Sequence, residues 1–179
     1  ANQARDTMVA KFKLEDLDAQ GRLNYQLYDA QVTEMNEAQK WRLHGYDITQ
    51  MHGTHAWIPS FLINVHRVDT REDAEAYIQR LRGVNAVIEL AIQDLKDSHE
   101  AGVLPPAFVF PMVIDDCKNL LKGAPFDEGE PSTWLTDIQT KINGIKDLSD
   151  DERATLTEDA KTAIRDVVGP AYTQLLEVL

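Results

Sequence analysis

The chain has 179 residues, of which 43% are hydrophobic, and its formal net charge is -12 at pH 7. This length suits one buried core, so we expect one domain. The 30 acidic residues outnumber the 18 basic ones, and the basic residues form no cluster. Such a chain would repel a phosphate backbone, so we expect no nucleic acid partner. No stretch approaches the roughly 20 apolar residues that span a bilayer, and no basic-then-apolar leader opens the chain.

Both ends of the sequence indicate a cut. The chain opens at Ala1 without an initiator methionine. It closes on an apolar helical stripe formed by Tyr172, Leu175, Leu176, Val178 and Leu179. No glycine, proline or basic last turn marks the end of this helix. We therefore expect residues 1–179 to be a single helical domain and a fragment of a longer protein. If the leucines are exposed they predict a homodimer through this helix, and if they fold back onto the chain's own core they predict a monomer.

The spacing of apolar residues predicts a first helix from about Asp18 to His44, capped by Gly45. Its apolar residues cover so wide an arc that we expect burial on more than one side: Leu23, Leu27, Tyr28, Ala30, Met35, Ala38 and Trp41. Three polar residues fall within this arc, Asn24, Gln31 and Arg42. They must find hydrogen-bond partners, either in an internal network or in a ligand.

Helix-capping residues and glycine or proline residues mark where the later helices begin and end. Thr70 with Asp73 resembles a capping box and opens a helix that Gly83 ends. The next predicted helix runs from Asn85 to about Ala101. A further helical spacing from Phe110 to Leu121 contains Pro111, so that helix either starts at the proline or is distorted there.

The remaining third of the sequence predicts one loop and two helices. The loop is 124–131, whose acids do not match a calcium loop. A helix over 134–148 follows, and Ser149 with Glu152 opens a last one that keeps its apolar phase through Pro170, which predicts a kink. No segment keeps the alternation of a strand, so the fold class is all-α, an irregular bundle of about six helices with one long packed loop at about 45–69.

That loop holds the unusual residues. Between Asp47 and His66 lie His52, Gly53, His55, Trp57 and Pro59. Its apolar side chains predict that it packs inward, anchored by Trp57, Phe61 and Leu62. The polar part of the loop, residues 50–55, gives the candidate substrate-binding residues, Gln50, His52 and His55.

Known catalytic patterns are missing from the sequence. His52 and His55 form an H-x-x-H pair, but Gly53 and Pro59 argue against a helix there, and the zincin pattern needs a glutamate and a four-residue step. A hydrogen-bonded histidine pair is thus favoured over a metal site. The chain has no G-x-S-x-G and no G-K-[ST], and the adjacent Asp115 and Asp116 would point about 100° apart on a helix. We expect no catalytic residue, no metal ligand and no cofactor in this chain.

Five motifs follow one another along the chain. They are LNYQLYDAQ at 23–31, Q-x-x-G with a later proline (Gln50, Gly53, Pro59), D-A-x-x-Y-x-x-R-L at 73–81, G-x-x-x-P at 102–106, and V-x-P-A-Y at 168–172. In this order and spacing the chain resembles the bacterial domain-of-unknown-function family 885 (DUF885), over roughly residues 15–179. The resemblance implies a longer protein similar to zinc metallopeptidases, often exported or lipid-anchored. Its H-E-x-x-x-G-H-like zinc motif would lie C-terminal to this chain, and none of its metal ligands falls on a residue present here.

Two functions then compete. In the first, the chain is the N-terminal helical scaffold of a metallopeptidase-like lipoprotein, without its own catalytic site, and its partners are the missing C-terminal part and a peptide substrate. The resemblance places such a protein in the periplasm or at the cell envelope. In the second, the chain is a self-contained helical binding module for a peptide or small ligand. The parent reading frame separates them, because a downstream H-E-x-x-H-like motif supports the first and a stop codon near Leu179 the second.

Overall fold

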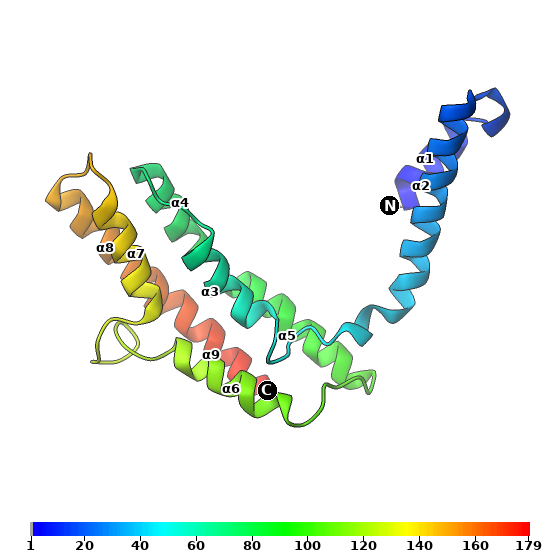
Figure 1. Ribbon diagram of the computed structural model, residues 1–179. Helices are drawn as coiled ribbons and strands as arrows, with labels where there is room; N and C mark the ends of the chain where they lie inside the picture. The colour runs from blue at the N-terminus through cyan, green and yellow to red at the C-terminus, as the bar shows by residue number, and fades with distance from the viewer. Residues whose placement is uncertain (1) are drawn as a thin grey trace. The chain divides into compact units, whose positions relative to one another are not determined.

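The structure, a computed structural model, describes residues 2–179 and is all-α, as predicted (Figure 1). Its chain divides after Gly45 into two compact units, residues 1–45 and 46–179. This division leaves the single domain of the sequence analysis as a prediction. Within the described part of the chain, no helix has both the length and the apolar character needed to cross a membrane.

The first unit contains α1 (Asn2–Lys11), a 3-10 turn (Leu14–Asp16), α2 (Ala19–Ala38) and a 3-10 helix (Gln39–Gly45). The side chain of Asp18 caps α2 by accepting a 2.7 Å hydrogen bond from the backbone N–H of Gly21. Arg5 of α1 donates a 2.6 Å hydrogen bond to Asp29 of α2. The helix at α2 was predicted, whereas α1 was not, because its sequence lacks an apolar stripe.

The expected burial of α2 on more than one side is wrong. Val32 is the one residue of this helix that is buried. Leu23, Leu27 and Met35 are 48%, 60% and 53% exposed. The polar residues Asn24, Gln31 and Arg42, which were expected inside the arc, are exposed as well. The first unit thus presents an apolar helix face to solvent, as surfaces that contact other proteins often do.

The second unit is built from seven further helices: α3 (Thr54–Asn64), α4 (Arg71–Arg82), α5 (Val84–Glu100), α6 (Val109–Leu120), α7 (Thr133–Gly144), α8 (Asp150–Ala163) and α9 (Gly169–Val178). α9 packs against α5 and α6, α8 packs against α4 and α7, and α3 packs against α5 and α7 (Figure 1). Both predicted capping boxes are present, Thr70 with Asp73 at α4 and Ser149 with Glu152 at α8. One core of buried side chains joins these helices.

The long packed loop predicted at about 45–69 is wrong in its middle, because α3 lies there with Pro59 in its interior. A proline lacks the N–H that would bond to the carbonyl four residues earlier, which here is that of His55. The hydroxyl of Tyr172, on α9, donates a 2.7 Å hydrogen bond to this carbonyl instead. A side chain from another helix therefore satisfies the backbone group that the proline leaves free.

Two other prolines are accommodated by local geometry. Pro111 lies in the first turn of α6, where the backbone N–H has no partner inside the helix, so neither predicted alternative was needed. The predicted kinked helix at the end of the chain is α8 followed by α9, joined by a π-helical turn, Ile164–Val168. This wider turn precedes Pro170 and lets the two helices continue one another.

Helix C-termini in the second unit are capped by side chains from later helices. The indole of Trp134 donates a 3.0 Å hydrogen bond to the carbonyl of Leu120 at the end of α6. Arg153 donates to the carbonyls of Ile142 and Ile145 at the end of α7. These donors give the last carbonyls of each helix a side-chain partner, and the carbonyl of Ile142 also accepts a 3.2 Å hydrogen bond from the backbone N–H of Ile145.

The C-terminal leucines fold back onto the core. Leu175 is fully buried, and Leu176 and Leu179 are partly buried against the same core. Of the two alternatives for this helix, the structure shows the one in which the leucines fold back, and only Val178 of its large apolar residues is exposed. A homodimer through this helix stays a prediction and no longer has that support.

Segment 124–131 is the surface turn that was predicted. The carboxylate of Asp127 accepts hydrogen bonds from the backbone N–H groups of Gly123, at 3.0 Å, and Gly129, at 2.7 Å. These two bonds lower the pKa of Asp127, since they favour the ionised carboxylate. The acids of this loop therefore shape the turn.

The bond between Tyr172 and His55 can be tested with two substitutions. Tyr172→Phe leaves a buried carbonyl without a donor, so we expect the free energy of unfolding to fall by about 1–3 kcal/mol. Pro59→Ala restores an N–H that can bond to the same carbonyl, so in that background Tyr172→Phe should cost less than about 1 kcal/mol. Urea unfolding of the four proteins measures this, and equal losses in both backgrounds would contradict the account.

Two tryptophans form a matched pair for a second test. Trp134 is fully buried, whereas Trp57, expected as an anchor, is 61% exposed. Trp134→Ala should lower the free energy of unfolding by roughly 3–5 kcal/mol. Trp57→Ala should change it by less than about 1 kcal/mol. Comparable losses from the two substitutions would show that α3 does not face the core as described.

Candidate functional site

The segment before α3 is a tight turn built around Thr49. Its backbone N–H donates a 2.8 Å hydrogen bond to the carbonyl of His52. Its hydroxyl accepts hydrogen bonds from the backbone N–H groups of Met51 and His52, both at 3.2 Å. The turn is thus held by one buried threonine, as in other side-chain-stabilised turns.

Gly53 closes this turn and opens α3. Its φ is +145°, a conformation that side chains other than glycine rarely adopt. A Cβ here would lie 3.0 Å from the Cα of Ile48 and 2.9 Å from the ring of His55. The glycine that was taken as evidence against a helix therefore marks the helix start.

The three candidate binding residues occupy different environments. Gln50 is half-buried, His52 is exposed and His55 is 1% exposed within α3. His52 lines an open hollow of about 600 Å³, together with Met51, Trp57 and Val87. Neither Gln50 nor His55 lines this hollow. A binding role for the three stays a prediction, and the burial of His55 speaks against direct contact with a ligand.

His55 is held as a neutral side chain. Burial lowers its pKa, and nearby His52 lowers it further, against an opposing effect from Asp116. Its Nδ1 atom is buried and has no hydrogen-bond partner within the described residues. In the same part of the chain, no three His, Cys, Asp or Glu side chains lie where they could share a metal ion.

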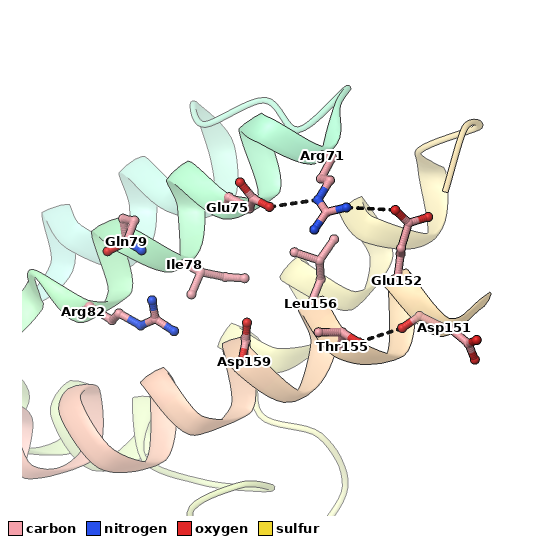
Figure 2. A pocket seen from close by; sticks show the side chains of 10 residues that line it. All are labelled: Arg71, Glu75, Ile78, Gln79, Arg82, Asp151, Glu152, Thr155, Leu156 and Asp159. Carbon is pink, nitrogen blue, oxygen red and sulfur yellow. Dashed lines mark hydrogen bonds and ion pairs between the residues drawn. The ribbon is translucent and has the colours of Figure 1, made fainter. Parts of the chain in front are cut away.

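A second groove lies between α4 and α8 and has a volume of about 320 Å³ (Figure 2). Arg71 bridges it, with 2.9 Å to Glu75 on its own helix and 2.8 Å to Glu152 on α8. Arg82 and Asp159 line the same groove farther along. Exposed ion pairs of this kind contribute little to stability. Arg71 therefore holds the carboxylates of Glu75 and Glu152, two of the four acids that line this groove.

The sequence analysis missed a partly buried polar cluster between α3, α4 and α7. Lys141 donates hydrogen bonds of 2.6 and 3.0 Å to the carbonyls of Leu62 and Ile63, at the end of α3. Its ammonium group also lies 2.8 Å from Asp137. Tyr77 donates a 2.8 Å hydrogen bond to this carboxylate, and burial raises the pKa of the tyrosine. This cluster caps α3 and neutralises its own charges.

A weak sequence signal for this cluster exists. Asp137 and Lys141 are spaced i, i+4 and directly precede Ile138 and Ile142, two residues of the apolar stripe. An acid and a base that flank a buried stripe at this spacing can pair at its edge. Cys117 lies outside this cluster and is also buried, and burial raises the pKa of its thiol to about 12.

Acid should destabilise the protein through its buried histidines. The pKa values of His55 and His66 are both lowered, mainly by burial. A histidine in the unfolded chain has a pKa of about 6.5, so as the pH falls the unfolded chain binds protons at a higher pH than the folded chain does. The free energy of unfolding should thus be steady above about pH 7 and decline below about pH 6.5, toward the lowered pKa values.

Urea midpoints at pH 7.5 and 5.5 measure this decline above the range in which carboxylates titrate. His55→Gln should reduce the difference between the two midpoints. His52→Gln, at an exposed position, should reduce it less, because burial lowers the pKa of His55 more than His52 does. An undiminished difference in the His55→Gln variant would contradict the assignment.

Comparison with known proteins places the chain. The model of a family described as "Bacterial protein of unknown function (DUF885)" matches residues 1–179. The searches of curated proteins and of solved structures gave no match. Because the family match covers the whole chain, this protein belongs to the DUF885 family of bacterial proteins.

Proposed function

We propose that the chain is a helical scaffold portion of a metallopeptidase-like protein, and that α2 packs against a further part of that protein. The catalytic zinc and its ligands would belong to that further part, which binds the peptide substrate. An exported or lipid-anchored protein of the periplasm or cell envelope would suit the resemblance noted in the sequence. The resemblance to the family supports a larger parent protein, and the exposure of apolar residues on α2 is the observation that supports a contact with its further part.

Exposed apolar residues share one face of α2. Leu23, Leu27, Ala30 and Ala38 follow helical spacing in one stripe on this face, and Glu34 interrupts it between the two alanines. All four are exposed. Within the first unit, α1 reaches α2 through the ion pair between Arg5 and Asp29, on a different side of the helix from this stripe. An apolar stripe of this length on a surface helix is typical of a protein contact.

Leu27→Glu tests the proposal, with the neighbouring Gln26→Glu as its matched control. Both residues are exposed in this chain, so both substitutions should change its unfolding free energy by less than about 0.5 kcal/mol. In the protein encoded by the full reading frame, Leu27→Glu should cost roughly 1.5–3 kcal/mol, because the leucine would be buried there. Gln26→Glu should stay near zero in both proteins.

Thermal unfolding of the chain and of the full-frame protein measures the difference. An equal effect of Leu27→Glu in both would contradict the proposal. So would a reading frame that stops near Leu179 or lacks an H-E-x-x-H-like motif downstream.

A second candidate function is a self-contained binding module for a small ligand. One observation favours it, namely that α3 and α5 leave large apolar side chains exposed next to each other. Trp57 and Val87 line both the hollow beside His52 and a neighbouring groove. The chain alone would then bind its ligand with no further protein.

A further inference from the structure

A groove of about 380 Å³ lies between α3 and the junction of α4 with α5. Trp57 and Phe61 line it from α3, and Val84 and Val87 line it from α5. The volume falls within the range of roughly 300–1,000 Å³ that is common for small-molecule sites. No acidic residue lines it, although acids outnumber bases by 30 to 18 in the chain.

Aromatic side chains make the wall of this groove. The rings of Trp57 and Phe61 stack with centres 5.3 Å apart and planes 17° apart. This stacking holds both rings in place, although Trp57 is largely exposed. Two fixed aromatic rings present an apolar surface that loses little conformational freedom when a ligand covers it.

The one charged side chain of the groove is Arg80. Its guanidinium carbon lies 5.5 Å from the centre of the Phe61 ring. Its Nη1 atom lies 2.7 Å from Nδ1 and 2.9 Å from Nε2 of His66, so one ring nitrogen accepts a hydrogen bond. The guanidinium group is therefore positioned on two sides.

His66 acts as a neutral acceptor for Arg80. Burial lowers the pKa of His66, and the charges of Arg80 and Lys141 lower it further, against Asp73 and Asp137. A neutral imidazole can accept from Arg80, whereas an imidazolium would repel it. In the described part of the chain, no ion pair joins Arg80 to a carboxylate. Since a guanidinium group has five N–H donors, most of those on Arg80 are available to a ligand.

We propose that this groove binds a small apolar molecule that carries one carboxylate. The apolar body lies against Trp57, Phe61 and Val87, and the carboxylate pairs with Arg80. A positioned guanidinium group matches a carboxylate through two parallel hydrogen bonds. A peptide fits less well, because Arg80 is the only charged or polar side chain in the wall, so most amide groups of a peptide would have no hydrogen-bond partner there.

This inference does not depend on a metallopeptidase-like parent, because it concerns binding by the chain alone. Loss of the proposed scaffold function would leave it standing, and its own failure would leave the role of α2 untouched. The two proposals also use different residues and different helices.

Titration of the chain with 4-phenylbutanoate tests the site, with 4-phenylbutanamide as the neutral probe of the same shape. Isothermal calorimetry at pH 7.5 and low salt should give a dissociation constant on the order of 0.1–1 mM for the acid, as expected for a ligand of about 12 heavy atoms. The amide should bind at least about tenfold more weakly than the acid, because it lacks the negative charge that pairs with Arg80.

Two arginines on α4 give a matched pair of variants. Arg80→Met should weaken binding of the acid about tenfold and leave that of the amide unchanged. Arg82→Met should leave both unchanged, because Arg82 lines the groove toward α8 instead. Val87→Glu, at an exposed position, should abolish binding of the acid, since it places a negative charge in the apolar wall. Circular dichroism of each variant checks that the fold is retained.

Several outcomes would overturn the proposal. They are equal affinity for acid and amide, an equal loss from Arg82→Met and Arg80→Met, and no binding of the acid up to about 10 mM, well above the constant expected for this ligand size. A capped, uncharged phenylalanine peptide that binds more tightly than the acid would also overturn it, in favour of a peptide groove.

Discussion

The hydrogen bond from the Tyr172 hydroxyl to the carbonyl of His55 is the contact on which the second unit depends. Pro59 would otherwise leave that carbonyl without a partner inside a buried helix, at a cost on the order of 1–3 kcal/mol. The same tyrosine ring packs edge-on against Trp134, with ring centres 5.8 Å apart. One side chain of α9 therefore fixes α3 and contacts α7, so these helices are positioned together.

The same constraint recurs at the ends of the other helices. Side chains donate hydrogen bonds to the last backbone carbonyls of three helices: Trp134 at the end of α6, Arg153 at the end of α7 and Lys141 at the end of α3. In an acidic chain with few cations, two of them serve as caps where the helix dipole favours positive charge. Arg71 is occupied by two carboxylates. Arg80 is different, because it is oriented by a neutral histidine and an aromatic ring and faces an apolar groove.

Local signals were enough to predict much of this fold. The two capping boxes open α4 and α8 as expected, because each depends on side chains only three residues apart. α3 was missed because Gly53 and Pro59 oppose a helix locally, and the compensating hydroxyl lies 117 residues away in the sequence. An apolar residue type also does not fix burial: Leu62 faces the core, whereas Trp57 on the same helix faces solvent.

The candidate site was harder to predict for the same reason. His52 and His55 are close in sequence, yet one ends a turn and the other begins a buried helix, so they do not form one surface. Arg80 gives no signal of its own in the sequence. Its environment arises only when α3 brings Phe61, and the segment after it brings His66, to the same place.

The π-helical turn at Ile164–Val168 ties the position of Tyr172 to the number of residues before it. A π turn holds one residue more than the α-helical turn it replaces. Replacing the π turn by a regular α-helix with the same number of residues would therefore rotate every later side chain by about 100°. The Tyr172 hydroxyl would then turn away from α3, so the wide turn is as necessary as the residue it positions. Deleting one residue within the turn, by contrast, would let the segment become α-helical and leave Tyr172 facing α3.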